Sequence, residues 1–331
     1  MRSLRLHAAG DLRLHDEPVP APGPGEALLK VSAVGICGSD LHWFNEGNIG
    51  DAGLSHPLIL GHEIAGVFEN GQRVAVDPSI TCGQCKFCKE GNPNFCESLI
   101  FAGHANQDGA LREYMNWPSR FCYPLPAELS NADGVMLEPL GVAIHAVDLA
   151  HLQVGMNVGV FGCGPIGLLM IQLAKLSGAR QIIASDLLAH RLAAAGPCGA
   201  TKVIQVEKDK VSQEVLAATR EQGLDVIFEA AGQNAAVETS VAALKPGGTI
   251  ILAGIPSDDH TTFTASIARR KGITIKLVRR MKNTYPRAIG LVQNGKVDVR
   301  SLVTHRFPLE KANEAFKTAV RREGIKVIVE I

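Results

Sequence analysis

The chain has 331 residues, of which 46% are hydrophobic, and it contains 34 glycines and 17 prolines. Its length allows two domains, and its composition is typical of a globular α/β protein rich in turns. Lysine plus arginine and aspartate plus glutamate each number 33, so at pH 7 no net charge steers the protein towards nucleic acid or an anionic membrane. No apolar run reaches transmembrane length, and residues 1–4 lack the apolar core of a signal peptide. We therefore expect a cytoplasmic protein whose partners include neither nucleic acid nor membrane.

The N-terminal part is predicted to consist of short β-strands joined by turns. Candidate strands cover residues 12–14, 27–31, 64–68 and 73–76. The last two are expected to form a hairpin, because Asn70-Gly71 between them is a strong turn signal.

The same part of the chain offers a mixed set of metal ligands. Cys37 supplies a thiolate, His62 an imidazole, and Glu63 and Glu138 supply carboxylates. One thiolate, one imidazole and one carboxylate leave an open position on zinc, which then acts as a strong Lewis acid. The set predicts a catalytic zinc that binds an alcohol oxygen and lowers its pKa. Either carboxylate is a candidate ligand, and the other would hold the metal-bound water.

Two roles are open for the polar residues that follow Cys37. Ser39 is placed to take the alcohol proton and pass it through cofactor hydroxyls to His42 and solvent. Asp40 is placed to orient a neighbouring metal ligand. The alternative is that Ser39 and Asp40 cap a helix that begins here, and both roles can hold together.

A second group of cysteines lies in residues 82–96, a segment with several turn-forming residues and little apolar content. Its members are Cys82, Cys85, Cys88 and Cys96. The spacing favours reduced metal ligands over disulfides in a large chain without an export signal. Four thiolates close the coordination of zinc and would stabilise a lobe that lacks its own core. The segment therefore predicts a structural zinc, with a redox dithiol as the alternative.

From about residue 154 the pattern changes to alternating strands and helices. Strands are expected at 157–161, 181–185, 202–206, 225–229 and 249–253, with helices at 166–177, 188–195, 211–222 and 235–244. This alternation predicts a parallel, doubly wound sheet. Helices near 285–294 and 309–321 and a strand at 326–330 are expected to follow.

The segment Gly162-Cys163-Gly164-Pro165-Ile166-Gly167 fits G-x-G-x-x-G between a predicted strand and a predicted helix. Its glycines permit a tight turn, a close approach to a pyrophosphate and close helix packing, and the helix N-terminus faces the phosphate. Asp186 ends the next predicted strand, where a carboxylate would bind both ribose hydroxyls and repel a 2′-phosphate. NAD is therefore expected rather than NADP, with Arg191 nearby as the contrary signal. The alternative is a structural turn with a surface aspartate.

Together these residues resemble the zinc-dependent medium-chain dehydrogenase family over essentially the whole chain. Within the family the resemblance is to the polyol branch, which contains sorbitol (L-iditol) dehydrogenase and its sugar-alcohol and aldonate relatives. The segments that carry it are residues 35–42, 61–63, 137–140 and 303–310. In ethanol-type alcohol dehydrogenases the position that matches Glu138 is a cysteine, so the glutamate points away from those enzymes.

The resemblance implies an α/β protein with a GroES-like, β-rich catalytic domain in residues 1–141, which includes the structural zinc lobe at 82–96. A Rossmann NAD-binding domain would occupy residues 142–275, and residues 276–331 would complete the catalytic domain. It also implies a homodimer or homotetramer.

The resemblance further implies roles for individual residues. Cys37, His62 and Glu63 would be the zinc ligands, with Glu138 near the zinc-bound water or the substrate. Arg280 would line the polyol pocket, or Arg279 if the alignment shifts by one. Other residues expected to shape the pocket are Trp43 or Phe44 and the loops near Phe101 and Asn106.

The leading hypothesis is an oxidoreductase that uses zinc and NAD to oxidise a secondary alcohol of a polyol or sugar acid to a ketone. One alternative is a threonine-type amino-alcohol dehydrogenase with the same zinc chemistry. Another is a non-catalytic NAD-binding protein on the same fold. The intact set of Cys37, Ser39, His62 and Glu63 argues against the last alternative, because a retired enzyme commonly loses its metal ligands.

Overall fold

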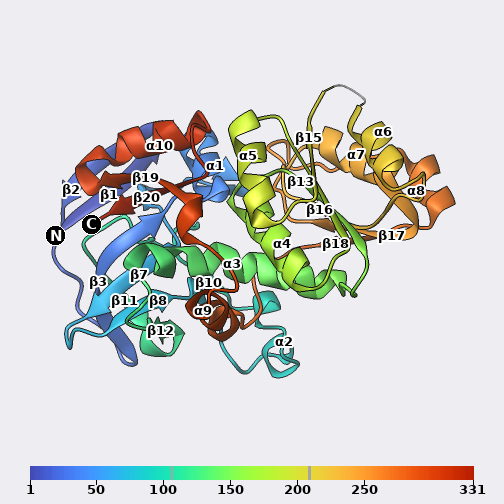
Figure 1. The fold of residues 1–331 in the computed structure, drawn as a ribbon. Coiled ribbons are helices and arrows are strands. Elements are labelled where there is room, and N and C mark those ends of the chain that lie inside the picture. Colours follow the sequence, from blue (N-terminus) through green and yellow to red (C-terminus); the bar gives the residue numbers. More distant parts are fainter. Residues whose placement is uncertain (106, 208–209) are drawn as a thin grey trace. The chain divides into compact units, whose positions relative to one another are not determined.

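The computed structural model describes residues 1–105, 107–207 and 210–331, so Asn106 lies outside the described residues. The chain forms two compact units (Figure 1). The first comprises Met1–Gly141, Lys282–Gly295 and Val299–Ile331, and the second comprises Val142–Met281 and Lys296–Asp298. The domain borders expected from the sequence lie after residues 141 and 275, whereas the units divide after Gly141 and Met281.

The first unit is built mainly of β-strands. Its strands are β1 (Arg2–Ala8), β2 (Asp11–Asp16), β3 (Glu26–Gly35), β4 (Asn48–Ile49), β5 (Ala52–Gly53), β6 (Leu58–Ile59), β7 (Glu63–Phe68), β8 (Arg73–Val76), β9 (Ser79–Ile80), β10 (Ile100–Phe101), β11 (Tyr114–Pro118), β12 (Cys122–Pro124), β19 (Val303–Pro308) and β20 (Lys326–Glu330). Its helices are α1 (Gly38–Glu46), α2 (Lys86–Lys89), α9 (Tyr285–Gln293) and α10 (Ala312–Val320), together with the first part of α3 (Asn131–Ala150), which continues into the second unit. Short 3₁₀ turns lie at Pro93–Phe95, Ser119–Phe121, Arg300–Leu302 and Leu309–Lys311.

The main sheet of this unit joins the two ends of the chain. Its strands run in the order β12-β8-β7-β3-β20-β19, and β11 also pairs with β3. The last strand, β20, lies antiparallel to β3 with Ile328 opposite Gly35. The C-terminal segment therefore completes the sheet that carries the N-terminal strands. The predicted hairpin is confirmed, since β7 and β8 pair with Ile64 opposite Val76.

The core of the first unit lies between this sheet and the elements packed on it. Leu29, Val31 and Val34 of β3 are buried together with Trp117 of β11 and Phe316 of α10. In the middle of β3, exposed Lys30 stands between buried Leu29 and Val31, the alternation expected for a half-buried strand.

The second unit is an α/β unit. Its strands are β13 (Asn157–Phe161), β14 (Gln181–Asp186), β15 (Lys202–Gln205), β16 (Leu224–Glu229), β17 (Leu244–Leu252) and β18 (Thr274–Leu277). Its helices are α4 (Pro165–Leu176), α5 (Ala189–Cys198), α6 (Lys210–Ala218), α7 (Asn234–Ala243) and α8 (Ala265–Lys271). All strand pairs are parallel, in the order β15-β14-β13-β16-β17-β18. The predicted doubly wound sheet is confirmed. Its order reverses between β13 and β16, which is where such sheets bind ligands.

Three helices were not expected from the sequence, of which α2 is a short helix of 4 residues in the four-cysteine lobe; the other two are larger. The first is α3, which has Pro139 in its interior; proline lacks an N–H and normally ends a helix. Burial explains the exception, because residues 132–141 are largely inaccessible to solvent and packing overrides local propensity. The second is α8, a short helix of 7 residues. Among the described residues, no helix has the length and apolar content needed to cross a membrane.

Candidate active site and metal centres

The four cysteines of residues 82–96 form one compact cluster. Their sulfur atoms all lie within 4.8 Å of one another. Backbone hydrogen bonds from Gln84 and Cys85 lower the pKa of the Cys82 thiol to about 6, whereas desolvation raises that of Cys88 to about 12. Neighbouring thiolates repel one another unless a cation lies between them. Four convergent sulfurs with no other donor fit a closed, tetrahedral structural zinc.

A second set of donors meets where helix α1 begins and strand β7 starts. Cys37 is the N-cap residue of α1, and His62 directly precedes β7. The side chain of Cys37 lies close enough to His62 to help raise the pKa of the imidazole, and the Ser39 hydroxyl oxygen lies 3.5 Å from Nε2 of His62. The ring is buried, and the ring of Phe101 packs 5.1 Å from it between centroids. The structure therefore brings together three residues that the sequence singles out: Cys37, Ser39 and His62.

Asp40 connects the two metal-ligand candidates. Its Oδ1 lies 3.4 Å from Nδ1 of His62 and accepts the N–H of Gly61 at 3.1 Å. Its Oδ2 accepts the N–H of Cys37 at 2.9 Å. Asp40 thus completes the cap of α1 and lies where it can orient His62, which are the two roles considered for it. Ser39 is not the cap residue, so its hydroxyl is not needed for that purpose.

The pair of Asp40 and His62 is electrostatically coupled. Burial by itself lowers the pKa of His62, but the charge of Asp40, its hydrogen bond and the nearby Cys37 together outweigh burial and raise that pKa well above the usual value. Burial by itself raises the pKa of Asp40, but the charge of His62 together with the hydrogen bonds from His62 and from the Cys37 and Gly61 N–H groups lowers the net pKa. With Nδ1–H directed to Asp40, Nε2 faces Ser39 and is the nitrogen suited to a metal.

The two candidate carboxylates have different surroundings. Both oxygens of Glu63 accept hydrogen bonds from Nζ of Lys326 at 2.6 Å, and this ion pair is almost completely buried. Nζ also donates to the carbonyl of Ile36 at 3.1 Å. A Cβ on Gly35 would lie 1.9 Å from Oε2 of Glu63, so only glycine leaves room for this carboxylate.

Glu138 lies on α3 and is 4% exposed. Burial raises the pKa of its carboxyl to about 7, with a further contribution from the charge of Glu63. Across the residues that the structure describes, only the four-cysteine cluster has three or more ligand atoms within 4.8 Å of one another. Cys37, His62 and the carboxylates are therefore more widely spaced, and Glu63 is turned towards Lys326. As a donor set of sulfur, imidazole and carboxylate they still fit a zinc with an open position.

Lys326 was not predicted from the sequence. It begins the final strand, where it is followed by the apolar residues Val327, Ile328 and Val329. A lysine at the start of a buried strand is a weak signal by itself, and its partner Glu63 lies 263 residues away in the chain. Only the pairing of β20 with β3 brings the two together.

The remaining site candidates of the first unit lie on α1. Nδ1 of His42 is 3.3 Å from Oε1 of Glu46, one helical turn further on. Trp43 and Phe44 are both core residues, 1% and 6% exposed. Trp43 packs edge-on against His104, and Phe44 against Phe316 of α10.

The glycine motif of the second unit has the expected geometry. Gly162 follows β13 with φ of 99°, and a Cβ there would lie 2.7 Å from the backbone of Ala230. A Cβ on Gly167 would lie 1.9 Å from the carbonyl oxygen of Gly162. Pro165 and Ile166 begin α4. The tight turn and the close packing of helix and strand both require glycine at these two positions.

Asp186 ends β14 beside this turn, as predicted. Its carboxylate accepts the N–H groups of Cys163 at 2.7 Å and Leu188 at 2.8 Å. These bonds fix the side chain next to the glycine motif and leave lone pairs for a ligand. Arg191 on α5 also lies here, since its Nη1 is 3.6 Å from where a Cβ of Gly164 would stand. Arg280 belongs to the same unit and has φ of 55°.

Comparisons with known proteins agree with this architecture. The family model described as "Alcohol dehydrogenase GroES-like domain" matches residues 23–127, and the one described as "Zinc-binding dehydrogenase" matches residues 165–294. Sorbitol dehydrogenase of Gallus gallus is 39% identical over 98% of this chain and 94% of that protein. Sorbitol dehydrogenase of Bacillus subtilis is 36% identical over 99% of this chain and 97% of that protein.

A solved structure extends the comparison to three dimensions. The crystal structure of L-idonate 5-dehydrogenase from Escherichia coli matches with a TM-score of 0.92 and 27% identity, and the match covers 100% of this chain and 98% of that one. Sequence and fold thus agree along the whole length. The chain therefore belongs to the zinc-dependent medium-chain dehydrogenase family, in which it is an alcohol or polyol dehydrogenase related to sorbitol dehydrogenase.

Proposed function

We propose that the chain oxidises a secondary alcohol of a polyol or sugar acid to a ketone and transfers the hydride to NAD. The observation that carries this proposal is that Asp40 joins Cys37 to His62 and that Ser39 lies beside the His62 ring. When bound, zinc supplies a Lewis acid that lowers the pKa of an alcohol, and NAD supplies the hydride acceptor. The names of the relatives, sorbitol dehydrogenase and L-idonate 5-dehydrogenase, support a polyol or sugar acid as the substrate.

The proposed roles follow from the contacts of each side chain. Cys37 and His62 would hold the zinc, and Asp40 keeps His62 in the tautomer that leaves Nε2 available. Ser39 accepts the alcohol proton, because its hydroxyl lies on the Nε2 side of the ring. His42, paired with Glu46 at the end of the same helix, releases that proton to solvent.

The third zinc ligand is a choice between Glu63 and Glu138. The family resemblance favours Glu63, whereas the ion pair with Lys326 already neutralises Glu63 and favours Glu138. Zinc content of the Glu63→Gln and Glu138→Gln variants decides between them, because loss of a direct ligand lowers zinc retention more than loss of a group that holds water.

NAD is proposed over NADP because of Asp186. Its buried carboxylate is held beside the glycine motif by two backbone N–H groups, where it would accept hydrogen bonds from ribose hydroxyls and repel a 2′-phosphate. Turnover measured with each cofactor tests this. A clear preference for NADP would contradict the assignment and would transfer the specificity role to Arg191.

The substrate class is tested with a panel of sorbitol, xylitol, L-idonate and L-threonine, followed by NADH absorbance. A preference for L-threonine would favour an amino-alcohol dehydrogenase. No NADH from any alcohol, despite full zinc and tight NAD binding, would favour a non-catalytic protein. Arg280→Ala is expected to raise KM for the polyol if Arg280 lines the pocket. We also propose a homodimer or homotetramer, which light scattering measures, and a cytoplasmic location.

A further inference from the structure

We propose that Arg5, Glu17 and Asp108, here called the Arg5 network, position the segment that carries His62 for zinc binding. The three side chains come from β1, from the residue after β2 and from the loop before β11. The proposal rests on the proposed function, in which His62 is a zinc ligand. It assigns to these residues a positioning role and no contact with substrate.

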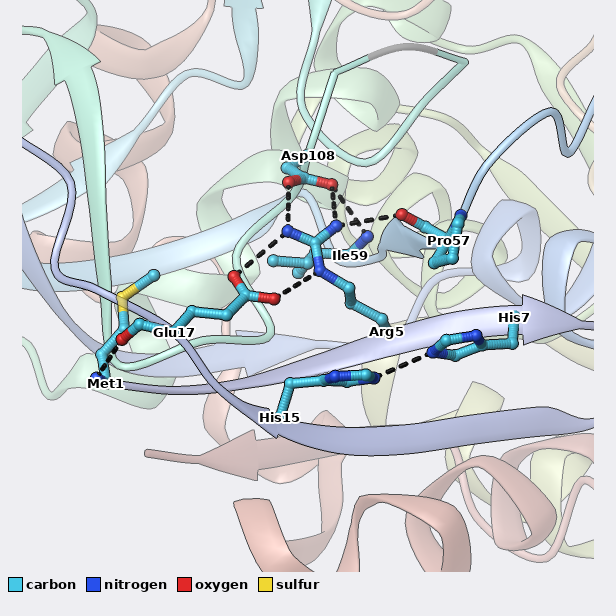
Figure 2. A network of polar contacts seen from close by, with 8 residues as sticks. All are labelled: Met1, Arg5, His7, His15, Glu17, Pro57, Ile59 and Asp108. Atoms are coloured by element: carbon cyan, nitrogen blue, oxygen red, sulfur yellow. Dashed lines mark hydrogen bonds and ion pairs between the residues drawn. The ribbon is translucent and has the colours of Figure 1, made fainter.

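The Arg5 guanidinium uses every donor group that it has (Figure 2). Nε donates to Oε1 of Glu17 at 2.5 Å and Nη2 to Oε2 of Glu17 at 3.1 Å. Nη1 and Nη2 donate to the two oxygens of Asp108 at 3.1 and 3.0 Å, and Nη1 also donates to the Pro57 carbonyl at 2.9 Å. A planar fork bound in this bidentate manner on two sides has one orientation. Asp108 is thus held in a fixed position.

Asp108 in turn holds the strand that leads to His62. Its Oδ1 accepts the N–H of Ile59 at 3.1 Å, and Ile59 lies opposite Arg5 where β6 pairs with β1. The carbonyl of Ile59 accepts the N–H of Gly109 at 2.7 Å. Both polar backbone groups of Ile59 are therefore bound by residues 108 and 109, three positions before His62.

The backbone contact continues up to the histidine. The N–H of Leu111 donates to the carbonyl of Leu60 at 3.0 Å, and the N–H of Ala110 donates to the carbonyl of Gly61 at 2.9 Å. Residues 109–111 therefore follow residues 59–61 at hydrogen-bond distance. The Gly61 N–H donates to Asp40, which also contacts the His62 ring.

Glycines allow the backbone of residues 109–111 to lie very close to residues 59–61, so that one segment cannot shift without displacing the other. A Cβ on Gly109 would lie 2.4 Å from the carbonyl oxygen of Gly61, and Gly61 itself has φ of 93°. Such a φ is strained for other residues and persists only where neighbours fix it. A shift of residues 108–109 must therefore move Gly61 and, with it, His62.

The matched control is a second arginine–aspartate pair on the same hairpin. Arg13 donates to Asp11 through Nε at 2.9 Å and Nη2 at 2.7 Å. This pair has the same bidentate chemistry, but both of its residues lie on β2 and neither bonds to residues 57–62. The control therefore distinguishes the effect of losing any ion pair on this hairpin from the effect of losing the contact with the segment that carries His62.

The test compares Asp108→Ala with Asp11→Ala in the zinc-loaded full chain. The readout is the rate at which each zinc ion is released to a chelator. We expect Asp108→Ala to release one of its two zinc ions about tenfold faster than wild type, the lower end of the range for groups that support a metal ligand. The zinc of the four cysteines is expected to leave at the wild-type rate and reports that the fold is intact. Asp11→Ala should match wild type for both ions.

Replacing zinc with cobalt supplies a second measurement, which would not change if the Arg5 network only stabilised the fold. The visible absorption of cobalt depends on ligand geometry, so its band for the Cys37–His62 site is expected to shift in Asp108→Ala and not in Asp11→Ala. Asp108→Asn keeps an oxygen for the Ile59 N–H and is expected to give an intermediate release rate. If Asp108→Ala does not fold, Asp108→Asn decides the question against wild type.

Equal release rates in Asp108→Asn, Asp11→Ala and wild type, with an unchanged cobalt spectrum, would overturn the proposal. His62→Ala distinguishes this from failure of the proposed function. If His62→Ala loses one zinc while the Asp108 variants do not, only the positioning role is wrong. If His62→Ala keeps both zinc ions, the zinc assignment on which the role rests is wrong.

Discussion

The four-cysteine lobe and the proposed Cys37–His62 zinc site of the first unit are assembled in opposite ways. The four-cysteine lobe takes all its donors from residues 82–96, which the short helix α2 and the turns around it bring together. The Cys37–His62 site draws on α1, the start of β7, α3 and the final strand. A local cluster of four sulfurs depends on its metal for stability, whereas a site made from distant elements depends on the fold that aligns them. The first can only be closed, and the second can keep an open position for chemistry.

The largest expected effect is on catalysis, from loss of the thiolate of the Cys37–His62 site. Cys37→Ser should abolish turnover, because it removes a proposed zinc ligand. NAD binding, measured by fluorescence titration, should remain, since we assign it to the other unit. Cys122→Ser is the control, because this thiol lies on β12 outside both proposed zinc sites and burial raises its pKa to about 12. Wild-type activity of Cys37→Ser would remove the basis of the proposed chemistry.

A cysteine-to-serine substitution in the four-cysteine lobe is expected to lower the stability of the fold and to leave the chemistry in place. Cys88→Ser opens the closed sulfur set and should lower the free energy of unfolding by several kcal/mol, a fraction of the roughly 10–16 kcal/mol with which structural zinc binds zinc-finger peptides. Thermal unfolding and zinc content per chain measure it. The surviving zinc should still support turnover at low temperature. Unchanged zinc content would mean that the four sulfurs do not form a metal site.

A third prediction concerns the buried ion pair of Lys326 and Glu63. Lys326→Met leaves the Glu63 carboxylate buried without its partner and is expected to cost about 3–5 kcal/mol of unfolding free energy. The double variant Lys326→Met with Glu63→Gln should recover most of that stability, because no buried charge then remains unpaired. If the double variant is no more stable than Lys326→Met, the pair is not the cause. Chemical denaturation of the three proteins gives the comparison.

The smallest expected effect comes from the residue that orients the histidine. Asp40→Asn should weaken zinc binding at the Cys37–His62 site by about 10–100-fold, since the amide no longer offers a charge to His62 Nδ1. Asp133→Asn is a close control. Asp133 is equally buried and accepts the Ser130 N–H at 2.7 Å at the start of α3, but it does not contact His62. Chelator competition on both variants shows whether the loss is specific to the orienting carboxylate.

Much of the proposed site could be predicted from residues that lie near one another in the sequence. The spacing of the lobe cysteines, the glycine motif after a strand and the acidic end of the next strand each place their chemistry through neighbours in sequence. Backbone geometry then follows from residue type, as Gly162 and Gly167 show. Helix α3 was not predicted, because proline in the interior of a segment normally indicates the end of a helix, and the burial that stabilises α3 around Pro139 is not visible in the local sequence.

By itself, the sequence determined which residue types this protein offers to zinc and to a dinucleotide, and the alternation that makes the second unit a parallel sheet. Only the tertiary structure decided how the donors are held. Lys326 reaches Glu63 across 263 residues and Arg5 reaches Asp108 across 103 residues. Such contacts depend on which strands pair, β20 with β3 and β1 with β6. Strand pairing is set by the packing of the whole unit, because the backbone of an unpaired strand edge is the same for every candidate partner.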